Sequence, residues 1–207
     1  INAIIDNREQ IDSKISYEVE KNNIQIYKGY TVVDTYGYRR INKISIMKLS
    51  KDGQTVIGDK TKLKCDCLGI SGGWTPAVHL FTQSGGKLKF REEDQVFIPD
   101  VYPSDQISIG SCNGDFSLEE IIKNTLFSIK KFLNIENSEY KTIEIVSDLN
   151  LSKRNIWLLP SDKSIGKTKS FVDYQNDATA KDIKLALREG FRSIEHVKRY
   201  TTTGMGT

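Results

Sequence analysis

The chain has 207 residues, 28% charged and 38% hydrophobic, with a formal net charge of +3. This balance is ordinary for a globular protein of one or two domains that buries a core. The apolar runs are far too short to span a membrane, no signal peptide is visible, and the net charge is too small to indicate nucleic acid by itself. We therefore expect a cytoplasmic protein.

Both ends of the chain look cut from a longer polypeptide. Ile1 opens directly on an apolar run, and the pattern of the last helix reaches Thr207 without a polar tail. We therefore interpret the sequence as an internal piece of a larger protein.

The first 29 residues predict a strand, a helix and a second strand. Residues 1–6 form an apolar run that ends in Asp6, which is typical of a buried parallel strand. Residues 8–22 have helical spacing, and residues 23–29 begin the next strand. An acid at the end of such a strand binds a ribose hydroxyl in dinucleotide-binding units, about 20 residues after a glycine-rich loop. That loop would precede residue 1, so a solvated Asp6 stays the alternative.

Residues 30–64 alternate apolar and polar side chains around turn residues and predict an antiparallel meander. Residues 65–73 then predict a strand that runs into a glycine turn at Gly72 and Gly73. Paired glycines at the carboxyl end of a strand allow a ligand to approach the backbone. A plain tight turn is the alternative. Two short strands are expected near residues 87–90 and 95–99.

Residues 107–133 predict a strand, a glycine-rich turn and a helix whose N-cap is Ser117, with an apolar stripe that is buried. The turn contains Gly110, Ser111, Asn113 and Gly114. Backbone N–H groups and a helix N-terminus at one point form a binding site for phosphate or pyrophosphate. A strand-to-helix turn without a ligand also favours glycine and stays open as an alternative.

The rest of the chain predicts a linker and a helical unit. Residues 135–170 are polar, apart from short apolar runs at 141–146 and 155–160, and the Gly-Lys-Thr at 166–168 lacks the first glycine of a P-loop. Residues 171–207 predict two helices. Thr179 caps the first helix and Gly190 ends it, and Ser193 caps the second.

No catalytic or metal-binding constellation stands out. Cys65 and Cys67 are one residue apart and fit the same face of a strand better than a metal site, and there are only two histidines. The basic residues of the last two helices suggest a solvated or interface surface. A helix–hairpin–helix module that contacts nucleic-acid phosphates is the alternative.

Three segments closely resemble the alpha-subunit family of heterotetrameric sarcosine oxidase, and the resemblance covers essentially the whole chain. They are DCLGISGGWTPAVHLFTQSGGKLKF, IGSCNGDFSLEE and the last 37 residues, FVDYQNDATAKDIKLALREGFRSIEHVKRYTTTGMGT. The resemblance implies an α/β fold that is part of a flavin/pyridine-nucleotide reductase with two dinucleotide domains. Asp66, Gly73 and Pro76 match one of its motifs.

The same resemblance implies the cofactors. Ser111 stands where the reductase fold has the Asp that binds FAD, so NAD is the better fit, with FAD as the alternative. The C-terminal unit resembles a small all-α module of the bacterioferritin-associated-ferredoxin type. Asp173 and Gln175 replace its first cysteine pair, so no iron–sulfur cluster is expected through them. Folate and covalent FMN belong elsewhere in such a complex.

These implications give three regions: a nucleotide-binding region at 1–134, a linker at 135–170 and the helical module at 171–207. We expect part of an oxidoreductase that demethylates sarcosine to glycine, with a beta subunit and smaller subunits as partners and no membrane or nucleic acid. The piece itself would bind a dinucleotide and lack the amine-oxidising residues. The alternatives are a flavin reductase that uses NADH or NADPH, an alpha subunit for proline or an opine, and the nucleic-acid module.

Overall fold

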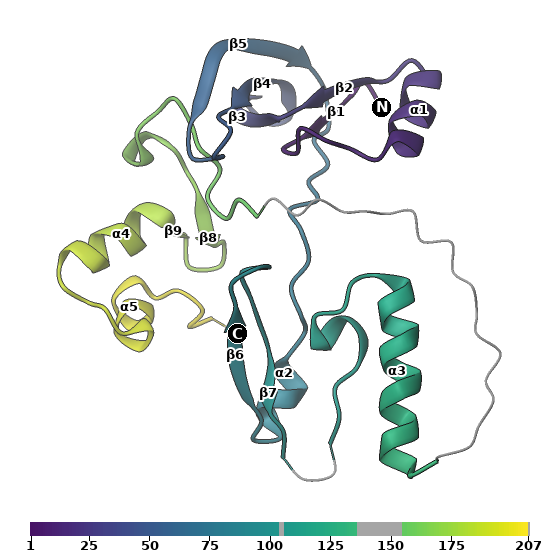
Figure 1. Cartoon of the computed structure of the whole chain (residues 1–207). Coiled ribbons are helices and arrows are strands. Elements are labelled where there is room, and N and C mark those ends of the chain that lie inside the picture. Colours follow the sequence, from purple (N-terminus) through teal and green to yellow (C-terminus); the bar gives the residue numbers. More distant parts are fainter. Residues whose placement is uncertain (104–105, 136–154, 207) are drawn as a thin grey trace. The chain divides into compact units, whose positions relative to one another are not determined.

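The computed structural model describes residues 1–103, 106–135 and 155–206 and has a mixed α/β architecture (Figure 1). Contacts divide the chain into two compact units. The first contains residues 1–9, 22–68 and 156–207, and the second contains residues 10–21 and 69–155. The division into regions 1–134, 135–170 and 171–207 stays a prediction.

The first unit opens with a parallel pair of strands, as expected. Strand β1 (Ala3–Asp6) pairs with β2 (Gln25–Lys28), and helix α1 (Ser13–Lys21) lies between them in the chain. The helix begins later than expected because Asp12 caps it: the Asp12 carboxylate accepts hydrogen bonds from the amides of Lys14 and Ile15, at 2.8 and 3.2 Å. Strand β1 is half-buried rather than buried, since its sheet has only two strands.

The expected meander is confirmed. Strands β3 (Tyr30–Gly37), β4 (Ile41–Leu49) and β5 (Val56–Lys64) form an antiparallel sheet in that order. The central strand carries the core of this sheet, because Ile44, Ile46, Met47 and Leu49 are all buried.

The strand expected at residues 65–73 is wrong. The Cys65 amide still donates to the Asn42 carbonyl at 3.2 Å, but β5 ends at Lys64 and residues 65–78 form neither helix nor strand. A strand needs a partner ladder, and β4 begins at Ile41, so pairing runs out at this point. The interpretation of Cys65 and Cys67 as strand neighbours fails with it, and Cys67 is exposed.

The second unit contains the two further strands that the sequence predicts. Strands β6 (Lys87–Arg91) and β7 (Val96–Val101) form an antiparallel hairpin. A short helix that the sequence did not predict, α2 (His79–Gln83), precedes them and buries Phe81.

The turn before the next helix has a different form from the expected one. The strand predicted at its start is absent, and Gly110–Asn113 form the 3-10 helix η1. Helix α3 (Leu118–Leu133) follows, with Ser117 at its N-cap as expected but without a side-chain capping bond. The predicted buried stripe is wrong: no residue of α3 is buried, and Leu118 is 59% exposed.

The C-terminal segment contains the two expected helices and a hairpin that the sequence did not reveal. The 3-10 helix η2 (Ile165–Lys167) leads to β8 (Phe171–Asp173), which pairs with β9 (Ala178–Thr179). Helices α4 (Ala180–Arg188) and α5 (Ile194–Thr201) follow. The apolar run at 141–146 lies outside the described residues, and the described run at 155–160 is not a strand.

The ends of α4 are those the sequence predicts. The Asp182 carboxylate accepts hydrogen bonds from the Thr179 amide and hydroxyl at 2.8 and 2.7 Å. Gly190 has φ +95° and its amide donates to the Leu187 carbonyl, while the Phe191 amide donates to the Ala186 carbonyl. These two bonds form a Schellman motif, which needs the left-handed backbone that glycine supplies.

Candidate functional site

The glycine-rich turn at residues 110–115 is closed by its own hydrogen bonds. The Gly114 amide donates to the Ser111 carbonyl at 3.1 Å, and the Asp115 amide donates to the Gly110 carbonyl at 3.2 Å. Gly110 and Gly114 have φ of +72° and +85°, so the turn uses backbone conformations that other residues rarely adopt. Ser111 is exposed.

The β6–β7 hairpin lies directly against this turn. The Arg91 Nη2 donates to the Gly114 carbonyl at 2.8 Å, and a Cβ on Gly114 would lie 2.9 Å from both Arg91 Nη2 and Ile98 Cγ2. Arg91 also forms an ion pair with the buried Asp94. Gly114 is therefore required for close packing, whether or not the turn binds a ligand.

Two side-chain atoms near the turn have no partner within the described residues. Arg91 Nε and Asp115 Oδ2 are buried and form no hydrogen bond there. The Tyr102 hydroxyl donates to Asn113 Oδ1 at 3.1 Å, and burial raises the pKa of Tyr102, with Cys112 and Asp115 contributing. Unpaired buried polar atoms are rare in folded proteins, and a polar group bound at this turn would supply the missing partners.

The electrostatics of the neighbouring helix oppose an anion. Glu119 and Glu120 occupy the first turn of α3, where their carboxylates neutralise the partial positive charge of the helix N-terminus. The negative charges of these two carboxylates would repel a pyrophosphate bound at this point.

Gly72 and Gly73 belong to the same compact unit as the turn at 110–115, but they do not build a site there. Both are exposed, and a Cβ on either would meet no atom of the described chain within 4 Å. Gly73 has φ +118°, which favours glycine, but no strand ends beside it.

Asp6 lies at the carboxyl end of β1, as expected, and it is already engaged by Arg8. The Arg8 guanidinium donates to both carboxylate oxygens of Asp6, at 3.0 and 2.7 Å, and the Arg8 amide adds a third bond of 2.8 Å. Burial raises the pKa of Asp6, but the bonds from Arg8 outweigh it and lower that pKa overall. A ribose at Asp6 would have to share this carboxylate with Arg8.

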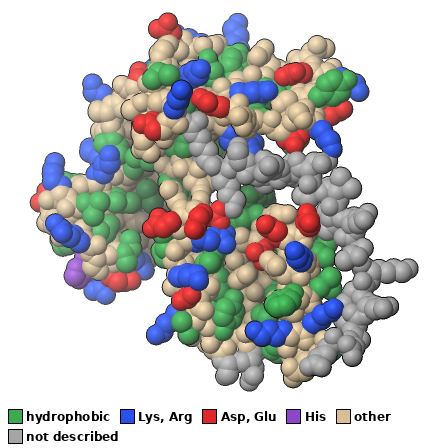
Figure 2. Space-filling view, viewed as in Figure 1, with side chains coloured by type: hydrophobic (Ala, Val, Ile, Leu, Met, Phe, Trp, Pro, Cys, Tyr) green, Lys and Arg blue, Asp and Glu red, His purple; other side chains and the backbone are tan. Residues whose placement is uncertain are grey.

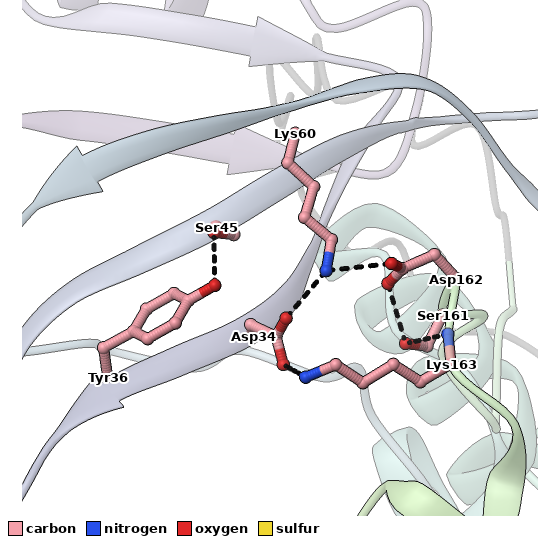
Figure 3. Close-up of polar contacts among 7 residues, drawn as sticks. All are labelled: Asp34, Tyr36, Ser45, Lys60, Ser161, Asp162 and Lys163. Carbon is pink, nitrogen blue, oxygen red and sulfur yellow. Dashed lines mark hydrogen bonds and ion pairs between the residues drawn. The ribbon is translucent and has the colours of Figure 1, made fainter.

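A four-charge cluster in the first unit was not predicted (Figure 3). The Asp34 carboxylate of β3 pairs with Lys60 of β5 at 2.9 Å and with Lys163, and Lys60 also pairs with Asp162 at 2.9 Å. Lys163 and Lys60 lower the pKa of Asp34, and Lys60 lowers the pKa of Asp162. The cluster attaches residues 161–163 to the meander.

No local sequence signal reveals this cluster. Asp34 is separated from Lys60 by 26 residues and from Lys163 by 129 residues. The alternation of lysines along β5 indicates only that one face of that strand is polar.

A second unpredicted arrangement surrounds Asp173 in the C-terminal segment. Its carboxylate accepts hydrogen bonds from the Gln175 amide at 2.9 Å, from the Asn176 side chain at 2.9 Å and from the Gly204 amide at 2.7 Å. These bonds lower the pKa of Asp173 to about 2, with the Asn176 side chain as the largest cause. Asp173 thus joins the β8–β9 loop to the segment that follows α5.

Within residues 1–103, 106–135 and 155–206, no group of three or more His, Cys, Asp and Glu side chains is arranged to hold a metal ion. In the same residues, no helix is long and apolar enough to cross a membrane.

Comparison with known proteins confirms the resemblance predicted from the sequence. Residues 167–207 match the family model of the sarcosine oxidase A3 domain. The sarcosine oxidase subunit alpha of Corynebacterium sp. (strain P-1) is 28% identical over 208 residues, covering 97% of this chain and 21% of that subunit. The subunit of the same name from Rhizobium meliloti (strain 1021) is 29% identical over 194 residues, covering 84% and 18%. The chain spans about a fifth of the length of these curated relatives.

Among solved structures, the L-proline dehydrogenase of P. horikoshii aligns with 99% of this chain and 40% of that chain. The sequence identity is 18% and the TM-score 0.48. This structural similarity is too low to carry an argument about fold or function.

Proposed function

We propose that the chain is part of the alpha subunit of a sarcosine oxidase complex, which demethylates sarcosine oxidatively to glycine in a folate-linked reaction. The observation that carries this proposal is the similarity to sarcosine oxidase alpha subunits over 97% of the chain, together with the A3-domain match at residues 167–207. In this proposal the chain contributes dinucleotide binding and subunit contacts, and the residues that oxidise the amine lie elsewhere in the complex.

The architecture of the first 64 residues supports a nucleotide-binding role. A parallel strand pair with an intervening helix is the unit from which dinucleotide-binding sheets are built, and here β1 and β2 form such a pair on either side of α1. The antiparallel meander β3–β5 then follows as one continuous excursion.

We place the dinucleotide contact at the turn formed by Gly110, Ser111, Asn113 and Gly114, and retain Gly72, Gly73 and Asp6 as further candidates. The positive φ of Gly110 and Gly114, together with the unpaired buried Nε–H donor of Arg91, supports this placement. The carboxylates in the first turn of α3 would repel the phosphates of a dinucleotide bound there. The placement is therefore tested by measuring the dinucleotide affinity of variants of the turn. NAD is preferred over FAD because Ser111 occupies the position of the flavin-binding Asp.

The same proposal assigns no iron–sulfur cluster to Asp173 and Gln175, since such clusters need thiolate ligands. Asp173 is instead bonded to amides of its own chain. Iron and acid-labile sulfide assays on the purified chain are expected to give neither element in stoichiometric amount. Two irons per chain would contradict the assignment.

The function is tested with the full-length parent, co-expressed with its beta subunit and smaller subunits. We expect peroxide release from sarcosine that exceeds release from L-proline or from an opine. Faster turnover of either other amine would reassign the substrate. NADH- or NADPH-dependent reduction of free flavin, without amine oxidation, would favour the reductase alternative.

The chain alone, even with added flavin and folate, is expected to release no peroxide from sarcosine above the free-flavin background. We further propose a cytoplasmic location for the complex. A binding assay with duplex DNA tests the remaining alternative, a nucleic-acid module at α4 and α5, and no observation favours it.

A further inference from the structure

We propose that the basic end of the β3–β4 hairpin is a docking surface for an acidic surface of another subunit. This surface, the basic hairpin surface, consists of Tyr38, Arg39 and Arg40 in the turn and Lys43 and Lys64 behind it. The identity of the partner as a subunit rests on the proposed function, whereas the surface itself rests on the charges and contacts described below.

Positive charge is concentrated in the meander. Residues 28–64 contain nine Lys or Arg and three Asp, a net charge of +6, although the whole chain carries only +3. The rest of the chain is therefore net acidic, by three charges. Segregation of this kind steers an oppositely charged partner towards one region of a molecule.

The hairpin presents its turn in a fixed conformation. Gly37 has φ +144°, and a Cβ at this position would lie 1.9 Å from the Arg40 carbonyl oxygen, so only glycine fits. The next residue, Tyr38, is 97% exposed, and Arg39 and Arg40 are exposed as well. A large side chain held almost entirely in water contributes nothing to the core and is available to a partner.

Behind the turn, two lysines face each other across adjacent strands. Lys43 of β4 is the direct register partner of Lys64 of β5, and like charges in this position destabilise a sheet. Lys43 Nζ lies 4.9 Å from the ring centroid of Tyr36, which offsets part of the repulsion through a cation–π contact. An anionic partner would remove the rest.

The cations of the basic hairpin surface differ from Lys60 of the same sheet, whose charge is neutralised by carboxylates. Lys60 is paired with Asp34 and Asp162. In the described part of the chain, no ion pair involves Arg39, Arg40, Lys43 or Lys64. These four cations lie at the same end of the meander, beside the exposed tyrosine.

The composition of the surface favours a protein partner. Tyrosine and arginine are, with tryptophan, the residues that most often dominate the binding energy of protein interfaces, and a single hairpin end is too small to follow a nucleic-acid backbone. The relatives of this chain are named as subunits, so partner subunits are the proteins for which such a surface would be used.

The test reverses the charge of the turn in the full-length parent. The variant Arg39→Glu/Arg40→Glu is compared with wild type for affinity to the co-expressed partner subunits, by biolayer interferometry at about 50 and 300 mM NaCl. We expect at least about tenfold weaker binding at low salt and a shallower salt dependence. The control Lys21→Glu/Lys87→Glu makes the same change in charge at exposed sites of α1 and β6 and should bind as wild type.

A second variant, Tyr38→Ala, leaves the charge unchanged and should also weaken binding, with the salt dependence preserved. Unchanged affinity in both hairpin variants would overturn the docking proposal, even in a complex that oxidises sarcosine. Weakened affinity in a complex that does not oxidise sarcosine would leave the docking surface in place and remove the proposed function. Loss of binding to a labelled RNA duplex, with subunit affinity unchanged, would assign the surface to nucleic acid and overturn the proposal.

Discussion

At the scale of single residues, Asp173 connects the β8–β9 loop with the residues that follow α5. One carboxylate bonds to the loop between β8 and β9 and to the Gly204 amide, 31 residues further along the chain. Gly206 lies equally close to this loop, since a Cβ there would meet Gln175 Oε1 at 2.3 Å. The carboxylate thus links the β8–β9 loop to the residues after α5 by hydrogen bonding.

Asp173→Asn removes the charge but keeps the shape, and we expect it to loosen residues 202–206. The pKa of Asp173 is lowered from 3.8 to about 2, so its stabilising effect is complete above pH 3.8 and is lost as the pH falls through 2. Thermal stability of the variant should therefore be below wild type at neutral pH, and the difference should shrink between these two pH values. Hydrogen exchange of the Gly204 amide should be faster, by about tenfold.

The control for this experiment is Asp177→Asn in the same loop. Asp177 has φ +53°, a conformation that Asn tolerates well. Equal stability of the Asp173 and Asp177 variants across the pH range would show that Asp173 does not join the two segments.

Gly37 provides a second test at this scale. Its replacement by Ala would place Cβ 1.9 Å from the Arg40 carbonyl oxygen, so the hairpin turn must shift, at a cost of about 2–3 kcal/mol. Gly58→Ala in β5 is the matched control: its φ is +75° but a Cβ there meets nothing within 4 Å, so only about 1 kcal/mol is expected. Urea denaturation measures both, and equal losses would contradict a tight turn.

At the scale of elements, local patterns predicted those structures that local forces determine. The meander follows from alternation and turn residues, and the ends of α4 follow from Thr179, Asp182 and Gly190. The prediction of a strand at 65–73 was wrong because a strand needs a pairing partner, and that partner comes from a distant part of the sequence. The hairpin β8–β9 is too short, at three and two residues, to leave a periodic pattern.

The same distinction holds for the candidate site. The sequence correctly placed Asp6 at a strand end and glycines 110 and 114 in the segment that leads into α3, although Gly110 begins a 3-10 helix there. It did not reveal that Arg8 binds Asp6 or that Arg91 packs on Gly114, because neither contact leaves a spacing that distinguishes it from ordinary surface charge. The buried stripe of α3 was wrong because periodicity shows which residues share a face, not what covers that face.

Dinucleotide binding by the 110–115 turn is tested with Gly110→Val in the intact subunit. Valine would place a β-branched side chain at φ +72°, where the backbone must approach a phosphate, and we expect at least about tenfold weaker dinucleotide binding. Gly85→Val is a control in the same compact unit, with φ +91° and open space around it. Equal affinities of the two variants by calorimetry, with folding confirmed by circular dichroism, would remove the turn from the candidate site.

At the scale of the whole molecule, large apolar side chains share the exposed surface with charged ones. Figure 2 shows hydrophobic side chains that remain on the visible surface among charged ones. Helix α3 exposes the large apolar side chains of Leu118, Phe127, Phe132 and Leu133. Apolar side chains exposed together on one element often mark a surface that contacts another part of the protein or a partner.

The four-charge cluster gives a whole-molecule prediction, because it joins residues 161–163 to strands that lie about a hundred or more positions earlier (Figure 3). Asp34 is the carboxylate shared by both lysines, so Asp34→Asn should loosen the segment and leave it held by the Lys60–Asp162 pair alone. The pairs are partly exposed and screened by water, so the expected change is modest. Trypsin should cleave after Lys163 and Lys167 about two- to fivefold faster in this variant, and Asp59→Asn on β5 should cleave as wild type.

Salt and pH separate this attachment from simple packing. About 0.5 M NaCl should accelerate cleavage of wild type towards the rate of Asp34→Asn, because salt screens ion pairs. The variant, which keeps only the Lys60–Asp162 pair, should respond less. The pKa of Asp34 is lowered by its bonds to Lys163 and Lys60, so the attachment is complete above pH 3.8 and weakens as the pH falls through the lowered value. Hydrogen exchange of the amides of residues 161–163, measured at acidic pH, reports this weakening of the attachment directly. Protection that is the same in wild type and Asp34→Asn at low salt would show that packing, not charge, holds the segment on the meander.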